Sequence, residues 1–261
     1  MEKIKTARVI SVCSGKGGTG KTVSAINLGM ALNSLGKSVA IVDANLTMPN
    51  VALHLGAPSP PVTLSHVLHG KNSIHDAIYA HSSGTKIIPG GISLNAIPKT
   101  CRETNERFGK ALQHLKRTND FVIIDSAPGL NDESMLALRA GDEIIIVTNP
   151  ELPAVTDALK TVKMANKMNK TISGVIVNRI RNDRIELPAG SLKSLLEIPI
   201  IAKVPEDIAV RHSIASRNAV VITSPKSPAG QAYMKLASKI ADSNYAEELG
   251  FFERFRSWFK R

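Results

Sequence analysis

The segment from Ser14 to Thr22 combines residue types and a spacing that suit the binding of a phosphate chain. It reads Ser-Gly-Lys-Gly-Gly-Thr-Gly-Lys-Thr and contains the spacing G-x-x-x-x-G-K-T. Glycines let backbone N–H groups turn inward around phosphate oxygens, and a following helix adds the partial positive charge of its N-terminus. In this motif Lys21 is expected to reach the β- and γ-phosphates of a nucleotide, and the Thr22 hydroxyl to ligate Mg²⁺. The residues expected to contact the nucleotide here are Gly15, Lys16, Gly17, Gly18, Thr19, Gly20, Lys21 and Thr22.

Two aspartates stand at the ends of apolar runs that are typical of buried strands. Asp43 follows the run from Ser38 to Val42, and Asp125 follows Phe121 to Ile124. Polar groups just past the carboxyl end of a strand lie where open α/β sheets bind ligands. The Asp125 carboxylate is therefore expected to hold hydrated Mg²⁺ beside the phosphate loop. Around Asp43, a plain turn with an aspartate cap would use the same residue types and stays open as an alternative.

The positioning of these side chains depends on short apolar runs that alternate with helix-length segments. Such strands, when separated by helices, indicate a parallel sheet covered on both faces. We therefore expect an α/β fold with a single domain and a mostly parallel β-sheet with helices on both faces. The segment from Gly56 to Ser83 is expected to form an insertion over one edge, and Pro225 to Ser243 a last packed helix. The expected strands are Ala7 to Cys13, Ser38 to Val42, Lys86 to Ile88, Phe121 to Ile124, Glu143 to Val147, Ile172 to Val177 and Ile200 to Val204.

The composition suits an ordinary globular domain, with 43% apolar and 21% charged residues. The two cysteines, Cys13 and Cys101, have no second Cys or His at metal-binding spacing, so both are expected to be reduced thiols. The sequence has no signal-peptide pattern and no apolar run of the ~18 residues that span a bilayer, which predicts a cytoplasmic protein. A net charge of +11 favours an anionic partner such as nucleotide, nucleic acid or lipid headgroup. A generally basic surface would explain the charge as well.

The last eleven residues carry a one-sided pattern of aromatic and basic side chains. At 100° per residue, the aromatic side chains fall within ~120° of arc and every polar residue falls outside it. This pattern is typical of an interfacial membrane anchor, although a terminal helix packed on the protein's own core or on another subunit is the alternative. The predicted boundaries are 1–243 for the phosphate-binding domain and 244–261 for a connection and an amphipathic membrane-targeting helix. The residues expected to contact the membrane are Phe251, Phe252, Phe255, Trp258, Phe259, Arg254, Arg256, Lys260 and Arg261.

With Lys16 as a second lysine in its loop, the sequence resembles the MinD/ParA family of P-loop ATPases, whose deviant Walker A loop has this pattern. The resemblance covers most of the chain, and it implies that Lys16 reaches the partner's phosphates across an ATP-sandwiched homodimer. The segment from Asp43 to Asn50 is similar to the family's first switch, with Asn45 in the place of the aspartate that orients or activates the attacking water. The catalytic candidates are Lys16, Lys21, Asp43 and Asn45, while Asp132 and Glu151 are alternative carboxylates for the water.

Two further strand ends resemble the base-recognition elements of that family. The resemblance implies that Asn178 hydrogen-bonds the adenine base, which Arg179 and the segment Pro205, Glu206 and Asp207 flank. For Arg179, a solvated position at the rim of the site is an equally good interpretation. No N-K-x-D guanine motif follows any strand, which favours ATP, with Mg²⁺, over GTP.

The resemblance is nearest to the MinD branch. It implies an ATP hydrolase that dimerises with ATP, binds the inner face of the cell membrane peripherally through its C-terminal helix and acts as a spatial positioning switch. Hydrolysis is expected to be slow, because the Asn45 amide can hold a water molecule but cannot accept its proton. The resemblance implies that a regulatory protein stimulates it. A ParA-like ATPase that binds DNA non-specifically is the first alternative. An iron–sulfur carrier of the same superfamily is the second, and the lack of suitable cysteines argues against it.

Overall fold

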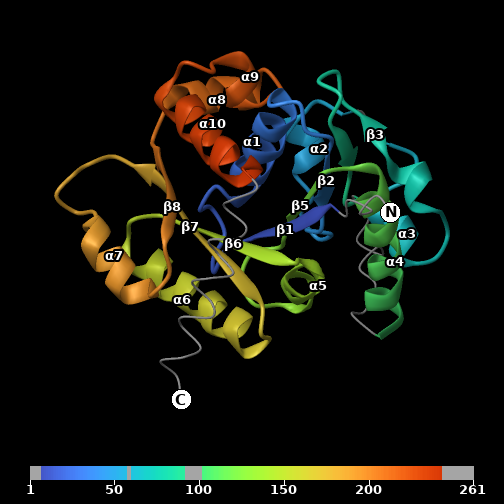
Figure 1. Ribbon diagram of the computed structural model, residues 1–261, viewed down its shortest axis with the longest axis horizontal. Helices are drawn as coiled ribbons and strands as arrows, with labels where there is room; N and C mark the ends of the chain where they lie inside the picture. The colour runs from blue at the N-terminus through green and yellow to red at the C-terminus, as the bar shows by residue number, and fades with distance from the viewer. Residues whose placement is uncertain (1–6, 58–59, 92–101, 243–261) are drawn as a thin grey trace.

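An eight-stranded, mostly parallel sheet forms the centre of the protein (Figure 1). The computed structural model describes residues 7–57, 60–91 and 102–242. The strand order is β3-β4-β2-β5-β1-β6-β7-β8, and every neighbouring pair is parallel except β3 and β4. The strands are β1 (Arg8–Cys13), β2 (Val39–Asp43), β3 (Tyr79–Ala80), β4 (Lys86–Ile88), β5 (Phe121–Asp125), β6 (Glu143–Thr148), β7 (Thr171–Ile180) and β8 (Ile200–Pro205).

Helices cover both faces of this sheet. Helices α1, α9 and α10 pack on one face, with α8 against α9, whereas α4, α5, α6 and α7 pack on the other. The helices are α1 (Lys21–Ser34), α2 (Val51–His54), α3 (Leu64–Leu68), the 3-10 helix η1 (Ile74–Ala77), α4 (Arg102–Thr118), α5 (Asp132–Ala140), α6 (Leu152–Lys167), α7 (Ala189–Leu196), α8 (Ile208–Ala215), α9 (Val220–Thr223) and α10 (Pro228–Ala241).

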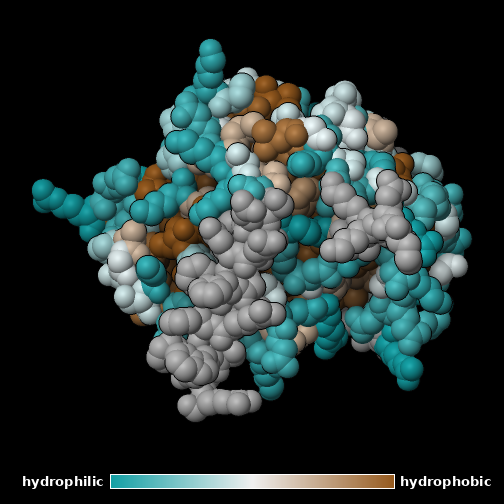
Figure 2. Space-filling model, in the orientation of Figure 1, coloured by the Kyte–Doolittle hydropathy of each residue, from teal (hydrophilic) through white to brown (hydrophobic). Residues whose placement is uncertain are grey.

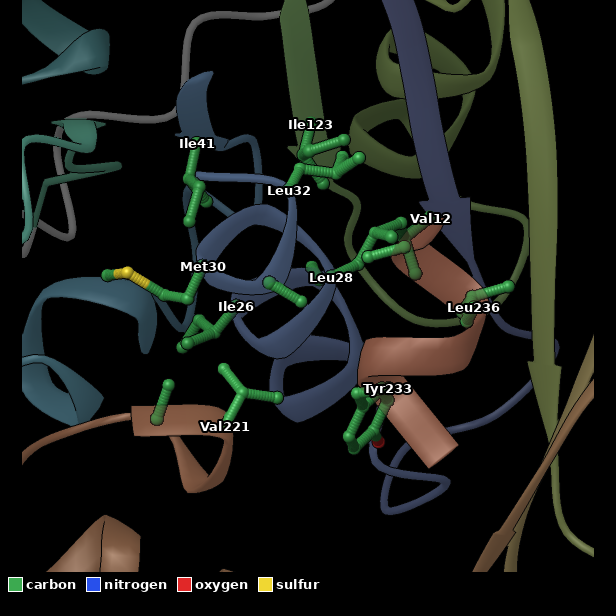
Figure 3. Close-up of a cluster of buried hydrophobic side chains, with 14 of the residues drawn as sticks. Val12, Ile26, Leu28, Met30, Leu32, Ile41, Ile123, Val221, Tyr233 and Leu236 are labelled. Carbon is green, nitrogen blue, oxygen red and sulfur yellow. The ribbon is translucent and has the colours of Figure 1, made fainter. Parts of the chain in front are cut away.

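The central strand β1 is buried on both faces because its side chains alternate between two apolar clusters. Ile10 and Val12 pack with α1 and α10, and Val9 packs with α4 and α5. Figure 3 shows the first of these clusters around α1. The hydroxyl groups of Ser24 and Tyr233 lie 3.1 Å apart and link α1 to α10 inside it. Each large aliphatic side chain buried in this way stabilises the fold by about 1.5–3 kcal/mol, so α1 is a firm support for the loop that precedes it.

The structure confirms the α/β fold class, and the seven expected strands are present with ends that differ by a few residues. The expected insertion contains α3, η1 and the short antiparallel strand β3, which the sequence pattern did not indicate. The last described helix, α10, ends at Ala241, so the expected tail at 244–261 lies outside the described residues and its boundary stays a prediction. Across residues 7–57, 60–91 and 102–242, no helix has the length and apolar character needed to cross a membrane.

Candidate active site

The glycine-rich loop, residues 14–20, joins β1 to α1 at the carboxyl edge of the sheet. Gly18 and Gly20 have φ angles of 81° and 87°, a left-handed conformation that glycine adopts without steric cost. Gly20 is also the N-cap of α1, which has no side-chain cap and no acidic residue in its first turn. The first N–H groups of α1 are therefore available to bind an anion, with the helix dipole behind them.

The loop is fixed from two sides. A Cβ atom at Gly15 would lie 2.1 Å from the carbonyl carbon of Asp157, so the loop backbone packs directly on the α6 backbone. On the other side, the Asn178 amide donates a hydrogen bond of 2.8 Å to the Thr19 carbonyl oxygen. A Cβ atom at Gly17, by contrast, would meet nothing within 4 Å. Only some of the glycines are thus needed for close packing.

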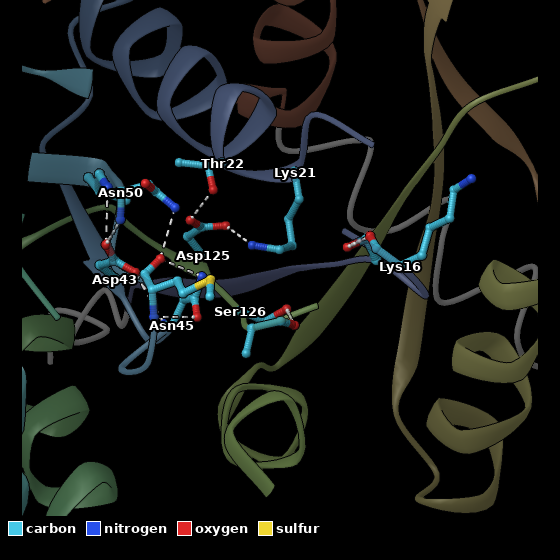
Figure 4. A network of polar contacts seen from close by, with 12 residues as sticks. Lys16, Lys21, Thr22, Asp43, Asn45, Asn50, Asp125 and Ser126 are labelled. Carbon is cyan, nitrogen blue, oxygen red and sulfur yellow. Dashed lines mark hydrogen bonds and ion pairs between the residues drawn. The ribbon is translucent and has the colours of Figure 1, made fainter. Parts of the chain in front are cut away.

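Lys21 and Thr22 converge on Asp125, as Figure 4 shows. The Lys21 ammonium lies 2.6 Å from one carboxylate oxygen of Asp125, and the Thr22 hydroxyl donates to the other at 2.7 Å. The Asp125 side chain is fully buried and that of Lys21 is 7% exposed. Such a buried charge pair needs good geometry to offset its loss of hydration. The three side chains that the sequence singled out for phosphate and Mg²⁺ binding therefore lie together.

Asp43 lies beside Asp125 and holds the base of the loop that follows β2. The Cα atoms of the two residues are register partners in neighbouring parallel strands. One Asp43 oxygen accepts from the Asn45 amide at 3.1 Å, and the other accepts from Asn50 and Val51 at 2.9 and 3.0 Å. Burial, and next the neighbouring Asp125 charge, raise the pKa of Asp43 to about 7, although the hydrogen bonds to its carboxylate and the Lys21 charge lower it. The carboxylate therefore fixes the loop and adds to a site that favours a cation.

Asn45 is nearly buried and its side chain closes the turn in which it lies. Its Nδ2 donates to the Met48 carbonyl oxygen at 2.7 Å, and its Oδ1 accepts from the Met48 amide at 3.3 Å. The expected turn around Asp43 is therefore present, together with the polar cluster that suggested a site. Because each amide atom of Asn45 retains one further hydrogen-bonding position, the residue can still orient a water molecule.

Lys16 lies apart from Lys21, as Figure 4 shows. Its ammonium is 3.7 Å from the carboxylate of Glu151, the N-cap residue of α6, and the two side chains are 35% and 53% exposed. The second lysine of the loop thus points to the surface of this subunit, whereas Lys21 points into the site.

The expected base-recognition residues lie at the ends of the adjacent strands β7 and β8. Arg179 is exposed and has a φ angle of 57°. Pro205 is the last residue of β8, and Glu206 lies 3.8 Å from Arg181. The Asp207 carboxylate caps α8 through the Ala209 amide at 2.9 Å and also accepts from the Ala229 amide at 3.0 Å. A structural role accounts for the Asp207 side chain, and the contact of this strand end with the base stays a prediction.

The donor groups of the site fit a nucleotide with Mg²⁺. Asp43, Asp125 and Thr22 supply hard oxygen ligands, which Mg²⁺ prefers. Among the described residues no group of three or more His, Cys, Asp or Glu could hold a metal ion by itself. The Thr19 hydroxyl and the side-chain amide oxygen (Oδ1) of Asn149 are buried without a hydrogen-bond partner in the described part of the chain. Both belong to segments of this edge, where a ligand would satisfy them.

Two features of the site were not predicted from the sequence. Glu133 of α5 accepts hydrogen bonds from both the amide and the hydroxyl of Thr47, and so joins the segments after β2 and β5. Asn178 contacts the phosphate loop, whereas the sequence suggested only a contact with the base. An acidic residue in the first turn of a helix is common, so Glu133 gave no specific signal.

A glycine-rich loop between a central parallel strand and a helix, with aspartates ending two neighbouring strands, defines a P-loop nucleotide-binding protein. Residues 7–176 match a family model described as an AAA domain. Residues 133–248 match the model of the 4Fe-4S iron sulfur cluster binding proteins of the NifH/frxC family. The chain is 40% identical over 243 residues to an uncharacterized ATP-binding protein of Methanocaldococcus jannaschii, with 93% of this chain and 91% of the relative covered.

Solved structures show the same relationship. The septum site-determining protein MinD of Pyrococcus horikoshii OT3, complexed with Mg-ADP, is 34% identical with a TM-score of 0.84, covering 90% of this chain and 96% of that one. The MinC:MinD cell division protein complex of Aquifex aeolicus matches with 28% identity and a TM-score of 0.78, covering 90% of this chain and 95% of that one. The chain therefore belongs to the MinD/ParA family of P-loop ATPases. The segment that matches the iron–sulfur model contains no cysteine, so it offers no thiolate ligand for a cluster.

Proposed function

We propose that this ATPase is a MinD-like positioning switch that dimerises with ATP and binds an anionic membrane surface as a dimer. The observation that carries the proposal is the position of Lys16, whose ammonium lies at the surface beside the phosphate loop. Exposed ion pairs contribute only about 0–1 kcal/mol, so the pairing with Glu151 holds Lys16 weakly. Lys16 is therefore free to bind the phosphates of a second subunit placed against this edge of the sheet.

Within one subunit, Lys21 and Thr22 are proposed to exchange their contacts with Asp125 for contacts with the nucleotide. Lys21 moves from the carboxylate to the β- and γ-phosphates, and the α1 N-terminus receives the phosphate oxygens. Asp125 and the Thr22 hydroxyl would hold Mg²⁺, and the ion would supply positive charge that neutralises the phosphates. Asn45 orients the attacking water without taking its proton, so positioning and charge supply most of the catalysis.

Because Lys16 is proposed to bind the phosphates of the partner subunit, its removal should affect dimerisation and not nucleotide binding. Lys16→Ala should keep nucleotide binding, because Lys21 and the loop backbone remain, but should lose the ATP-dependent dimer and the hydrolysis. Size-exclusion chromatography with ATP measures the dimer, and Lys160→Ala is a matched control that removes another exposed lysine of the same charge. A Lys16→Ala protein that still forms the ATP-dependent dimer would refute the proposed role.

Membrane binding is proposed for the tail from Phe251 to Arg261, on the basis of its aromatic and basic pattern. In Figure 2, hydrophobic side chains on the coloured part of the face in view lie in separate patches on a mostly hydrophilic surface. A single short anchor binds weakly, and a dimer that joins two anchors gains avidity. Deleting residues 250–261, or placing Asp at Phe255 and Trp258, should abolish sedimentation with anionic liposomes and leave nucleotide binding intact. If the truncated protein sediments as the full chain does, the tail does not bind the membrane, and packing on the protein's own core or on another subunit becomes the better interpretation.

A ParA-like role in DNA partitioning is the second candidate, supported by the net charge of +11. The same sedimentation assay with duplex DNA in place of liposomes distinguishes the two, since DNA binding through phosphates makes no use of the tail aromatics. A regulatory protein that stimulates hydrolysis is also proposed. The complex of the Aquifex aeolicus relative with MinC supports a protein partner, although not its effect on hydrolysis, which the proposal adds.

A further inference from the structure

Two loops of the site leave the sheet side by side and are joined by one pair of residues. Asp43 and Asp125 are register partners, so the segments that follow them emerge from neighbouring strands. Between these segments, the Thr47 amide donates to one carboxylate oxygen of Glu133 at 3.3 Å. The Thr47 hydroxyl donates to the other oxygen of the same carboxylate. Glu133 thus receives both hydrogen bonds from one residue of the loop after β2.

The burial of Glu133 shows that this contact is more than an incidental surface pair. Glu133 is 7% exposed and is the second residue of α5. In the described part of the chain no lysine or arginine forms an ion pair with it. The N-cap of α5 is Asn131, whose side chain accepts from the Ser134 amide at 2.9 Å, so capping does not occupy Glu133. A buried carboxylate costs free energy unless it is hydrogen-bonded, and the Thr47 donors and the helix dipole supply this compensation.

The contact controls a turn that contains Asn45. Asp43 holds the base of this turn through the amides of Asn45, Asn50 and Val51. Thr47 lies at the tip of the turn, between Asn45 and the Met48 groups to which Asn45 is bonded. The tip is therefore held from α5, and the base is held from β2. If the tip were released, the Asn45 amide would keep its local bonds but lose its fixed position relative to Asp125.

We propose that Glu133 is a positioning residue for ATP hydrolysis, which acts on Asn45 by tying Thr47 to α5. The two loops then form one unit over the phosphate site, and the water held by Asn45 keeps its alignment. The inference rests on the proposed function in one respect, because it assumes that Asn45 orients the attacking water. Glu133 contacts none of Lys21, Thr22 and Asp125 through a described hydrogen bond, so its effect should fall on turnover and not on ATP affinity.

The test compares Thr47→Val, Thr47→Ser and Glu133→Gln in the full chain. Thr47 is exposed, so its replacements should fold, and serine keeps the donor hydroxyl that valine lacks. We expect Thr47→Val and Glu133→Gln to lower kcat for ATP by about 10- to 100-fold, the size of effect that a misplacement of about 1 Å produces. KM should stay the same, and Thr47→Ser should keep most of the activity. The double variant should be no slower than the slower single variant, because both changes weaken the same contact.

Hydrogen exchange of the segment 44–50 in the nucleotide-free protein gives a second readout. Exchange should accelerate in Thr47→Val and Glu133→Gln and stay slow in Thr47→Ser. Equal kcat values for Thr47→Val and Thr47→Ser would overturn the proposal, as would losses that multiply in the double variant or faster exchange with unchanged kcat. If Glu133→Gln fails to fold, the comparison of Thr47→Val with Thr47→Ser tests the proposal. A wild-type chain without ATP hydrolysis would count against the proposed function, and the exchange of the Thr47 variants would then test the contact by itself.

Discussion

Replacing Asn45 by aspartate tests what the amide at this position does in hydrolysis. An aspartate can accept the proton of the attacking water, and a positioned general base is worth about 10²- to 10⁴-fold in rate. This range corresponds to about 2.7–5.4 kcal/mol of activation free energy. We therefore expect Asn45→Asp to accelerate ATP turnover without tightening nucleotide affinity.

The structure also shows a cost of this substitution to the stability of the turn. The substitution removes the hydrogen bond of 2.7 Å from Asn45 Nδ2 to the Met48 carbonyl oxygen. It also places a carboxylate oxygen beside that carbonyl and close to the buried Asp43. Loss of a buried hydrogen-bond partner costs about 1–3 kcal/mol, so the turn should loosen. The gain acts on the activation free energy, whereas the cost falls on the stability of the turn, so we expect faster hydrolysis together with a lower melting temperature of the nucleotide-free protein.

Single-turnover hydrolysis at saturating Mg-ATP is the assay, with nucleotide affinity measured separately by a fluorescent analogue. Asn50→Asp is a matched control, because Asn50 Nδ2 also donates to the Met48 carbonyl oxygen, at 2.8 Å, from the same loop. The control variant should not accelerate hydrolysis. Equal rates for the wild type and Asn45→Asp would mean that this residue does not limit the chemistry, and that another carboxylate such as Asp43, Asp132 or Glu151 serves the water.

Three further predictions concern the support of the site. Gly15→Ala should lower the free energy of unfolding by about 1–3 kcal/mol or more, because the new Cβ atom would overlap the α6 backbone. Gly17→Ala faces open space and should change it by less than about 0.5 kcal/mol; thermal melts of the two variants should therefore differ clearly. Burial raises the pKa of Asp207, but the hydrogen bonds that its carboxylate accepts outweigh this and hold the pKa below its ordinary value. Its stabilisation should thus be present above pH 3.8 and be lost as the pH falls through the folded pKa. Asp207→Ala should cost about 0.5–2 kcal/mol in urea unfolding at pH 7, and a cost that persists undiminished at pH 2 would contradict this. Burial raises the pKa of Cys13 to about 11, so in a Cys101→Ser background the native protein should not react with a thiol reagent at pH 8, whereas the urea-unfolded protein should.

The sequence predicted the strands well because the central strands are apolar runs buried on both faces, and it indicated the candidate site residues because they follow such runs. It did not indicate β3, since a two-residue antiparallel strand is too short to form a pattern. The contact between Thr47 and Glu133 joins residues 86 positions apart and has no local signature. The same holds for Asn178 and Thr19. Spacing along the chain can thus indicate candidate ligand-binding groups, whereas the contacts that hold them in place depend on the packed fold.

The outer strands of the sheet bear on how the protein avoids aggregation. An unprotected sheet edge can pair with a strand of another chain, and proteins block this with short edge strands, irregular pairing, lysine and proline. Here β3 has only two residues. At the opposite edge, β8 has exposed Lys203, ends at Pro205 and pairs with β7 through two register shifts. Neither edge is a good template for strand addition, so the chain should stay dispersed at the high local concentrations that recruitment to a surface would create.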